Sequence, residues 1–553
     1  MVLISGAISS NALVCLGISG ILSHRLHFIH GEHHLKGPQY LAAWVFATLA
    51  TICFLYINQY GILQPLILIN FAFFGPFFSS IVIYRLFQHP LKGFRGPKLA
   101  AVSKLWHLAH VFRTQNYLFL DGLVKKYGKV VRTGPQELTI TDPEIWSAIG
   151  SSACIKAPWY DMMFPYMSLN SIRGKEGYRT RRKLWDESLR LPTAYLPEVN
   201  SSIDRLASLL VKRVDASKGQ PTSIRTLFSH FSFDVMGEIA FGRSFALLSD
   251  IDSHDAPNLI SQGMSMLRFF TPIPWASRLC FTLAPYVPII TQKWNRGLQW
   301  AAEVCDERLA NGADSTHHSD AFSRFISAAY TNDDKTSLDH LALYGDAFAI
   351  TVAGSHSTAA TLTMLFYELA RHPDAQEQAR KEILAARSLH AESEGWTQER
   401  YPFLDGCINE ALRLYPVVPT GGIRQTVAKG IHVGDTWIPP HTVIVAPRWT
   451  LGRLESAFDM PNEFIPERWT SKTDMVKDAR AFNGFGIGQH MCPGKQLGLA
   501  EVRLVASKLL TSFRFTFKSM EPNKTKTVTD MQDAFTLAPG ELELVFSPLA
   551  KSP

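Results

Sequence analysis

The sequence predicts a mainly α-helical globular domain with short β-strands, preceded by an N-terminal membrane section. Residues 37–84 contain no Asp, Glu, Lys or Arg, and a run of this length accommodates two membrane-spanning helices of about 20 residues each. Residues 231–242 and 341–369 carry apolar side chains at helical spacing. Residues 127–135 have the pattern of a helix end followed by a strand and a turn. These observations place membrane helices first and a helix-rich domain after them.

The composition is that of a globular protein and argues against several classes of function. Hydrophobic residues make up 46% of the 553 residues and charged residues 19%, without repeats or low-complexity segments. The formal net charge of +7 fits a protein at a membrane surface with an acidic partner better than a nucleic-acid binder, which clusters its basic residues. The seven cysteines are scattered and odd in number, so a secreted disulfide framework is disfavoured.

Residues 1–84 are predicted to form a membrane anchor of about three transmembrane helices, at residues 2–23, 41–57 and 62–84. The polar residues 58–61 separate the second and third spans. Residues 2–23 are also long enough for a signal peptide. They lack a basic N-terminal region and a small-residue cleavage site, so we interpret them as a retained span.

The charges beside these spans predict the orientation of the anchor. Arg25 and Lys36 lie between the first two spans, and the chain after the third span is also basic, whereas the turn between the second and third carries no charge. Because basic flanks remain in the cytosol, we expect a luminal N-terminus and a cytosolic globular domain in the endoplasmic reticulum membrane. The sequon at Asn200 is then expected to stay unglycosylated. The five histidines between residues 24 and 34 fit solvated interfacial side chains better than a metal-binding tract.

Residues 85–98 are predicted to be a proline- and glycine-marked hinge between the anchor and the domain formed by residues 99–553. Pro90 and Pro97 have no N–H group to continue a helix, so the last anchor helix must end here. Further on, residues 231–242 predict an amphipathic helix that ends at Gly242, and we assign it only a role in the core.

Residues 178–185 predict a strongly basic helix. Tyr178 and Arg182 are four residues apart and share one face, whereas Arg179, Arg181 and Lys183 point elsewhere. A solvated helix face is the ordinary interpretation of such a pattern.

Residues 341–369 predict a long helix that is apolar all round, and such a helix is buried in a large domain. Gly354, in its middle, is expected to leave a gap where a ligand can sit, and the hydroxyl side chains beside it can carry protons. Glu410 and Arg413 lie at i and i+3 on another helix among apolar neighbours. This spacing predicts a buried ion pair that needs further hydrogen-bond partners.

Residues 485–494 place a single cysteine, Cys492, in a glycine-rich loop. Glycine allows backbone N–H groups to approach the sulfur and stabilise a thiolate. No second cysteine or histidine stands nearby at the spacing of a zinc or iron–sulfur site. One thiolate in a dry, glycine-lined loop is the ligand set of a heme iron. A buried structural cysteine is the alternative, but Phe485, Gly488 and His490 accompany Cys492 at fixed spacing and disfavour it.

This stretch resembles the heme-binding signature of the cytochromes P-450, F-x-x-G-x-R-x-C-x-G, with His490 in place of the usual arginine. The form of the signature with histidine at this position and proline after the cysteine resembles that of fungal membrane-bound members. The resemblance covers about residues 85–548, with the motifs in family order. It implies the cytochrome P-450 fold, mainly α-helical with small β-sheets. It also implies heme b between the helix of residues 341–369 and the Cys492 loop, with Cys492 as the ligand of the iron.

The resemblance implies further heme-binding residues. Tyr178 stands for the tryptophan of a W-x-x-x-R motif, and Arg182 is expected to bind one heme propionate, since a guanidinium pairs with a carboxylate. Arg424 is expected to reach the second propionate. Residues 451–453 replace the family's usual histidine–arginine pair, so we assign no contact there. The remaining heme-binding positions of the signature are Phe485, Gly488 and His490. The other basic residues of the helix at residues 178–185 are expected to face an acidic reductase.

Residues 353–358 resemble the oxygen-activation motif A-G-x-[DE]-T-[TS]. His356 takes the place of the acid and Ser357 that of the threonine, and with Thr358 they are expected to relay protons. In the alternative interpretation, His356 and Ser357 are substitutes that the packing tolerates, without a role in proton transfer. Glu410 and Arg413 match the family's E-x-x-R motif, and Arg468, in a match to F-x-P-E-R-[FW], completes a structural triad that does not act on substrate.

The activity implied is a monooxygenase that inserts one oxygen atom of O₂ into a hydrophobic substrate. Electrons are expected from NADPH through a separate NADPH-cytochrome P-450 reductase in the same lipid bilayer, because the chain has no flavin or nicotinamide fingerprint. An oxygen-independent isomerase or dehydratase and a non-catalytic heme or sterol binder are the alternatives. Fungal resemblance favours a terpenoid-like secondary metabolite as substrate. The apolar pocket candidates are Phe348, Ile423 and Phe535.

Overall fold

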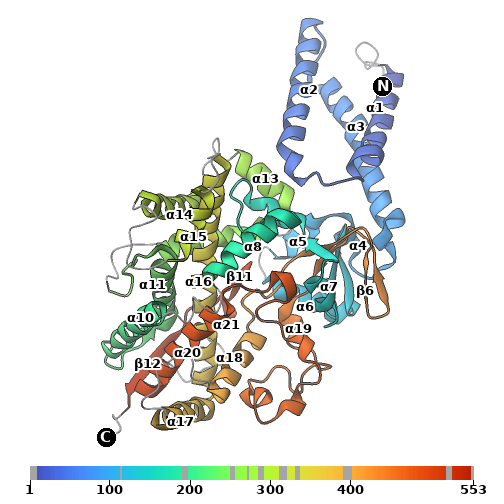
Figure 1. Cartoon of the computed structure of the whole chain (residues 1–553). Coiled ribbons are helices and arrows are strands. Elements are labelled where there is room, and N and C mark those ends of the chain that lie inside the picture. The colour runs from blue at the N-terminus through green and yellow to red at the C-terminus, as the bar shows by residue number, and fades with distance from the viewer. Residues whose placement is uncertain are drawn as a thin grey trace.

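The computed structural model describes residues 9–111, 115–189, 197–249, 256–270, 273–283, 292–310, 320–330, 337–389, 401–518 and 526–549. In these ranges helices dominate, and the strands gather in one five-stranded sheet and smaller sheets of two or three strands. The anchor helices project from one end of the helix-rich body (Figure 1). This is the mainly α-helical fold with small β-sheets that the sequence predicts.

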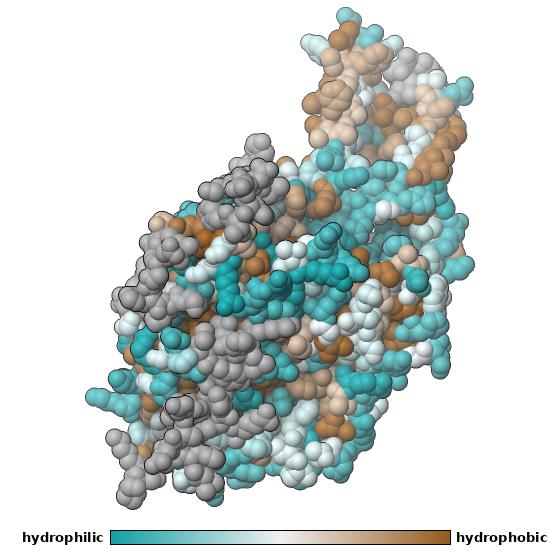
Figure 2. Space-filling model, in the orientation of Figure 1, coloured by the Kyte–Doolittle hydropathy of each residue, from teal (hydrophilic) through white to brown (hydrophobic). Residues whose placement is uncertain are grey.

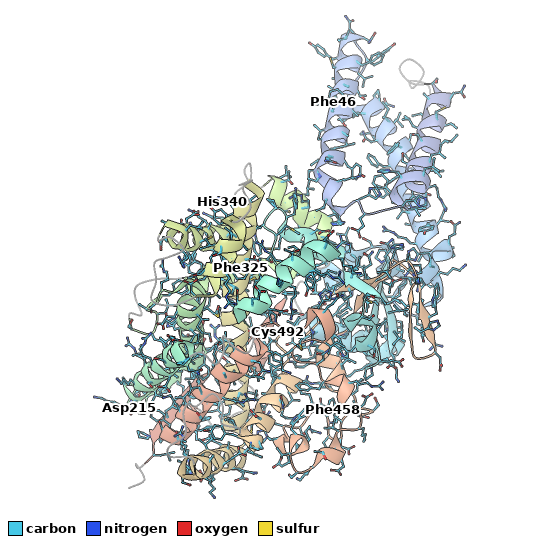
Figure 3. The ribbon with its side chains drawn as sticks, viewed as in Figure 1. Phe46, Asp215, Phe325, His340, Phe458 and Cys492 are labelled. Carbon is cyan, nitrogen blue, oxygen red and sulfur yellow. The ribbon has the colours of Figure 1, made fainter. Side chains whose placement is uncertain are left out.

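The anchor contains helix α1 (Ser10–Leu22), helix α2 (Gly37–Ile57) and helix α3 (Leu63–Ile83), and the first and third continue into π-helical turns at Ser23–Phe28 and Tyr84–Gln88. Two segments, His34–Ile57 and Leu63–Gln88, are long and apolar enough to cross a membrane. Their outer surface is apolar, in contrast to the more polar body (Figure 2). Phe46 of α2, for example, is 75% exposed (Figure 3). Part of the expected first span lies outside the described residues.

Helix α1 packs closely on helix α3. A Cβ atom on Gly20 would lie 2.4 Å from the carbonyl oxygen of Phe73, so only glycine allows this approach. Next to this contact, His24 Nδ1 and Ser80 Oγ are 2.8 Å apart. Close approach at small residues, reinforced by a polar contact between helices, is typical of helix pairs in membranes. A third span at α1 stays a prediction.

The hinge is fastened to the first strand of the body. The helical backbone ends at His89, before Pro90, and short helices follow at Pro90–Gly93 and Lys98–Val102 (α4). The Arg132 side chain donates hydrogen bonds to the carbonyl oxygens of Arg85 (3.0 Å) and Pro135 (2.8 Å), and its backbone N–H donates to Arg95 (2.7 Å). Gly96 has a φ of 159°, and a Cβ there would lie 2.4 Å from the Arg132 carbonyl oxygen. The hinge is therefore a docked segment.

The five-stranded sheet has the order β1-β2-β8-β5-β3. Helix α6 (Asn116–Tyr127) ends at Gly128, and the expected strand and turn follow, as β1 (Val130–Gly134) and the start of an antiparallel hairpin with β2 (Glu137–Ile140). Strand β2 pairs in parallel with β8 (Val443–Val445), which runs antiparallel to β5 (Arg424–Thr426). Strand β3 (Cys154–Lys156) pairs with β5 so that Lys156 stands opposite Arg424. The sheet thereby places two cationic residues side by side.

Helices α11 (Ile224–Phe241) and α16 (Ser337–Arg371) form the centre of the body. Ser223 caps the start of α11, and Gly242, with a φ of 64°, ends it where the sequence predicts. Most of α11 is buried. Helix α16 runs through the body (Figure 1). Its Phe366 stacks on Phe515, with ring centroids 4.8 Å apart. Helices α11 and α16 both contribute to the wall of the cavity described below.

The remaining elements surround helices α11 and α16. The helices are α5 (Lys104–Val111), α7 (Ile145–Gly150), η5 (Pro158–Met163, 3₁₀), α8 (Lys175–Leu189), α10 (Pro197–Asp215), α12 (Ala256–Phe270), α13 (Pro274–Leu283), α14 (Gln292–Ala310), α15 (Ala321–Tyr330), α17 (Pro373–Leu389), α18 (Pro402–Leu414), α19 (Arg448–Leu451), α20 (Lys495–Ser512) and α21 (Lys526–Thr529). The strands are β4 (Thr222–Ser223), β6 (Ile431–Val433), β7 (Thr436–Ile438), β9 (Phe513–Phe517), β10 (Gln532–Ala534), β11 (Thr536–Ala538) and β12 (Glu543–Pro548). Short 3₁₀ turns complete the C-terminal third.

Candidate functional site

A cavity of about 390 Å³ lies between helix α16, the Cys492 loop and the 3₁₀ helix η5. Cys492 lies in the interior of the body (Figure 3). The lining is largely apolar and includes Trp159, Met162, Met236, Trp294, Phe348, Val352, Leu412, Val417, Leu497, Val502 and Phe535. Such a lining favours a hydrophobic ligand.

The Cys492 loop is folded back on itself. The Cys492 N–H donates to the Phe485 carbonyl oxygen at 2.8 Å, and Gly486 and Gly488 have φ values of 74° and 60°. Phe485 lines the cavity; Gly488 does not, among the described lining residues. A Cβ on Gly488 would lie 2.2 Å from the Gly150 carbonyl oxygen, so this glycine serves the close packing of the loop on α7.

The Cys492 side chain lines the cavity and is exposed to it. Burial raises the pKa of its thiol above the ordinary value, while the Gly494 N–H, Arg182 and Lys495 oppose that rise. A group with these neighbours becomes a thiolate readily when a cation binds it. The arrangement fits a single-thiolate metal ligand.

Helix α8 docks on the same loop through the two residues that share its face. The Tyr178 hydroxyl donates to the Gln489 carbonyl oxygen (2.7 Å), and Arg182 Nη1 donates to that of Met491 (2.6 Å). Both side chains line the cavity. Arg181 differs from expectation, because it pairs with the buried carboxylate of Asp346 at 2.5 Å. The prediction that Arg181 faces a partner protein is wrong. Arg179 and Lys183 are exposed as expected.

One end of the cavity is strongly cationic, and we call it the cationic end. It contains Arg182, the predicted Arg424, and two residues that sequence reasoning missed, Lys156 and Arg448. Lys156 Nζ donates to the Leu169 carbonyl oxygen (2.5 Å) and lies 4.5 Å from the centre of the Tyr178 ring. Arg424 donates to the Tyr160 hydroxyl at 3.1 Å, but its buried Nε has no partner among the described residues.

His490 belongs to the same end. Its ring centroid is 4.7 Å from that of Tyr178, and its buried Nδ1 has no partner among the described residues. Burial, together with Arg424, Lys156 and Arg182, lowers the pKa of His490 to about 3. The imidazole is therefore neutral near pH 7, unlike the arginine that the family's signature usually has at this position.

The cationic end fits the propionates of heme. Its four cations face a cavity in which Glu501 is the one carboxylate among the described lining residues. Two buried nitrogens, Arg424 Nε and His490 Nδ1, have no hydrogen-bond partner among the described residues. Buried polar atoms ordinarily have such partners. A ligand with two carboxylates would satisfy both the charges and these nitrogens. Together with the Cys492 sulfur, these residues match the donor set expected for heme.

Residues 451–453 contribute no cation to the cavity. Arg453 instead stacks over the Trp449 ring, 3.5 Å from its centre, and is absent from the described lining. Arg448, five residues earlier, takes the position at the cavity. It donates from Nε to the Asn483 carbonyl oxygen at 2.8 Å, and burial followed by Arg424 lowers the pKa of its guanidinium to about 10.

The middle of helix α16 presents Ser357 and Thr358 to the cavity. Ser357 Oγ donates to the Ala353 carbonyl oxygen at 2.5 Å. His356 is not in the described lining. Its ring lies 5.7 Å from that of Phe233 on α11, its buried Nε2 has no described partner, and burial lowers its pKa to about 4. Gly354 lines the cavity as expected, although a Cβ there would lie 2.2 Å from Met236 Sδ, so its missing side chain is also needed for the packing of α16 on α11.

Glu501 is a site residue that sequence reasoning missed. It lines the cavity from helix α20, hydrogen-bonds to the Thr358 side chain, and has a buried Oε2 without a described partner. Burial raises the pKa of its carboxyl to about 8, against the effect of Thr358. A carboxyl with this pKa carries its proton near pH 7. The signal in the sequence was an acid within an apolar helix, nine residues after Cys492.

The structure brings the expected triad together in the core. Glu410 accepts from Arg413 (2.7 and 2.8 Å) and from Arg468 Nε (2.8 Å), and all three side chains are fully buried. Trp469 Nε1 and the Ile465 N–H also donate to Glu410. The triad ties α18 to the 3₁₀ helix at Pro466–Trp469, away from the cavity.

Two of the three pocket candidates line the cavity. Phe348 and Phe535 do so, and Phe535 stacks on Trp159 with centroids 4.7 Å apart. Ile423 is not in the described lining and packs into the core beside it. The prediction for Ile423 is wrong because its side chain packs against buried core residues and does not line the cavity.

Comparisons with known proteins agree with this geometry. Residues 96–546 match the family model described as Cytochrome P450. The chain is 36% identical over 471 residues to the protein named Cytochrome P450 monooxygenase FCK2 of Fusarium pseudograminearum, covering 85% of this chain and 84% of that protein. It is 33% identical over 528 residues to tryprostatin B 6-hydroxylase of Aspergillus fumigatus, covering 92% and 91%. With a cysteine sulfur facing a cavity that has a cationic end, and a family match over most of its length, the chain belongs to the cytochrome P450 family.

Proposed function

We propose that this cytochrome P450 monooxygenase uses heme b to hydroxylate, or oxidise in a related way, a hydrophobic secondary metabolite. The observation that carries the proposal is the cavity, in which one cysteine sulfur faces an apolar space with a cationic end. The name of the relative tryprostatin B 6-hydroxylase supports hydroxylation as the reaction class. A terpenoid-like molecule is the proposed substrate class.

Each cavity residue has a proposed role in holding the cofactor. Cys492 ligates the iron, while Arg182 and Arg424, supported by Lys156, Arg448 and the neutral His490, hold the two propionates. The bound heme supplies reductive activation of O₂ and the insertion of one oxygen atom into a C–H bond.

The protons needed for that chemistry come from the α16 side of the cavity. We propose that Ser357 and Thr358 carry them and that Glu501, protonated near pH 7, is their donor. A rotation of the Ser357 side chain exchanges its bond to Ala353 for one into the cavity. The proposed pairing of His356 with Ser357 has less support, because His356 packs toward Phe233.

The electrons are proposed to come from NADPH through NADPH-cytochrome P-450 reductase at the endoplasmic reticulum membrane. Two apolar helices with the length of membrane spans support a shared bilayer. The exposed Arg179 and Lys183 beside the Cys492 loop support docking of an acidic partner.

The decisive experiment measures O₂ consumption by the purified full-length protein with the reductase and NADPH, together with the carbon monoxide difference spectrum. We expect a carbonyl complex with the red-shifted Soret band of a thiolate ligand and O₂ uptake that depends on NADPH. Cys492→Ala should lose that band in folded protein. A normal carbonyl band without NADPH-dependent O₂ uptake would favour an oxygen-independent isomerase or dehydratase or a non-catalytic heme binder, and absence of heme would leave a non-catalytic sterol binder.

A further inference from the structure

The loop between the first two anchor helices, residues 29–36, reaches the globular domain through charged side chains. Arg173 donates from Nη1 and Nη2 to the two Glu32 carboxylate oxygens, each at 2.7 Å. His34 Nε2 lies 2.8 Å from Asp161 Oδ2, and Arg173 Nη1 lies 2.5 Å from the same oxygen. One guanidinium therefore joins the anchor loop to Asp161.

Arg173 also reaches the cavity wall from outside. Its Nε donates to the Lys156 carbonyl oxygen at 2.9 Å, at the end of β3. The Arg173, Asp161 and His34 side chains are only 13–15% exposed, whereas that of Glu32 is 38% exposed. The Arg173–Asp161 and His34–Asp161 pairs are therefore screened less than surface pairs, and the two parallel bonds from Arg173 fix the geometry of the more exposed pair with Glu32.

Asp161 belongs to a segment that forms the cavity wall. The 3₁₀ helix η5 (Pro158–Met163) contributes Trp159, Tyr160 and Met162 to the lining, among others. Its Asp161 side chain points the other way, to the anchor loop. The inner face of this short helix thus shapes the cavity while its outer face is held by Glu32, His34 and Arg173.

Helix α13 holds the same segment at its far end. Ser277 Oγ is 3.1 Å from Met162 Sδ, and Arg278 donates to the Phe164 carbonyl oxygen at 3.1 Å. Helix α13 lies against the lower end of α2 (Figure 1). The wall segment is therefore enclosed by parts of the anchor and by an element that contacts the anchor.

The three side chains Glu32, His34 and Asp161 place possible ligand atoms within 4.8 Å of one another. Because the Arg173 guanidinium lies between the two carboxylates, within 2.5–2.7 Å of both, a metal ion would meet a cation at that position. The cluster is an ion-pair network.

We propose that the anchor loop is a clamp on the substrate cavity, in which Glu32 and His34 are positioning residues that hold Asp161 and Arg173. The clamp keeps η5 in the conformation whose side chains line the cavity. The anchor then has a second task besides tethering, namely to set the shape of the pocket. This inference goes beyond the proposed reaction and does not depend on the substrate or on the oxidation that occurs.

The test compares Glu32→Ala with Glu187→Ala in full-length, heme-loaded protein in nanodiscs. Glu187 is a matched control, since it forms an exposed ion pair with Lys183 on α8 and does not touch the cavity. The first readout is hydrogen–deuterium exchange of peptides that cover residues 158–163. Losing the charged pair is expected to speed exchange there by roughly tenfold in Glu32→Ala, and to leave it unchanged in Glu187→Ala.

The second readout is the dissociation constant of 1-phenylimidazole, measured from its heme spectral shift. We expect Glu32→Ala to weaken binding several-fold, with Glu32→Gln in between because it keeps one acceptor oxygen. Exchange at residues 158–163 equal to that of Glu187→Ala would overturn the clamp. Faster exchange with unchanged affinity would overturn its role in shaping the cavity. Neither result bears on monooxygenase activity, so failure of the clamp and failure of the proposed function are distinguishable.

Discussion

At the scale of single residues, the cavity is built from charges that need a counter-charge. Lys156, Arg182, Arg424 and Arg448 converge at one end, and burial with neighbouring arginines lowers the pKa of Lys156 well below its ordinary value. Like charges this close destabilise the empty site, and a ligand with two carboxylates relieves the repulsion. Heme retention should therefore depend on residues that touch only its carboxylates.

We predict that Lys156→Met and Arg448→Met lose heme faster than the parent protein. Each substitution removes one charge-assisted contact, worth about 1.5–3 kcal/mol, so heme release should accelerate roughly tenfold or more. Transfer of heme to excess apomyoglobin measures the rate. Arg179→Met, on the exposed side of α8, is the control and should match the parent. If all three variants release heme equally fast, the cationic end does not hold propionates.

The hydroxyls and the carboxyl on the α16 side lead to a prediction about coupling. Ser357→Ala and Glu501→Gln should waste NADPH as hydrogen peroxide, because slower proton delivery lets peroxide escape. His356→Ala should uncouple less, and His356→Asp should stay near the parent level. Peroxide formed per NADPH consumed measures the effect, and an unchanged carbonyl spectrum shows that the heme is intact. Normal coupling in both Ser357→Ala and Glu501→Gln would exclude the relay.

Buried histidines outside the site predict how stability depends on pH. Burial, and then Lys104, lowers the pKa of His107 to about 3, and burial, then Arg132, lowers that of His89 to about 4. Because the folded pKa lies below the ordinary value of 6.5, the unfolded chain binds more protons between the two values. Each such histidine then lowers the free energy of unfolding by about 1.4 kcal/mol per pH unit as the pH falls below 6.5. In chemical denaturation at pH 7 and pH 5, His107→Gln should show a smaller loss than the parent. An equal loss would contradict the prediction.

At the scale of elements, the E-x-x-R spacing marks a buried network of hydrogen bonds around Glu410 that joins α18 to a distant segment. Glu410 serves two arginines, Trp469 and a backbone N–H at once, so its removal leaves two buried guanidiniums without a counter-charge. Glu410→Ala should therefore cost about 3–5 kcal/mol in the free energy of unfolding. Denaturant titration followed by circular dichroism measures it. Asp478→Ala, which removes the partner of the exposed Arg480, should cost far less, because solvent screens an exposed ion pair. Similar costs would mean that the triad does not hold α18.

Elements whose ends depend on local chemistry could be predicted from the sequence. Helix α11 ends at Gly242 because only glycine adopts the left-handed turn easily, and the hairpin after Gly128 follows the same logic. Contacts set by pairing between distant segments could not be predicted in this way. Lys156 reaches the site because β3 pairs with β5, and Glu501 because α20 faces α16. Arg181 turns inward to meet Asp346, which lies 165 residues further along the chain.

At the scale of the whole molecule, the anchor and the domain form one connected structure. The loop at residues 29–36 bonds to Arg173 and Asp161, and the hinge bonds to Arg132. Once α2 and α3 are inserted in a bilayer, both segments must lie on the same side of it as the globular domain. The sequon at Asn200 tests this orientation poorly, because Asn200 lies within helix α10 with a buried side-chain oxygen. A glycan would be absent from Asn200 on either side of the membrane, because the folded helix holds the side-chain amide with its oxygen buried.

The turn between α2 and α3 gives a sharper test of orientation. Gln59 is exposed at this turn, and since α2 and α3 each have the length of a span, the turn should emerge on the luminal side. His30, also exposed, lies in the loop on the side of the domain. In microsomes, with Cys15 and Cys53 replaced by serine, a membrane-impermeant maleimide should label His30→Cys directly and Gln59→Cys only after permeabilisation.

The same reagent, applied to a variant with a cysteine added at the N-terminus, reports on the topology of α1. Labelling only after permeabilisation supports a third span, and direct labelling means that α1 returns to the cytosolic side. Direct labelling of Gln59→Cys would show that α2 and α3 do not cross the bilayer, because a short turn between two apolar helices has no other route to the cytosolic face.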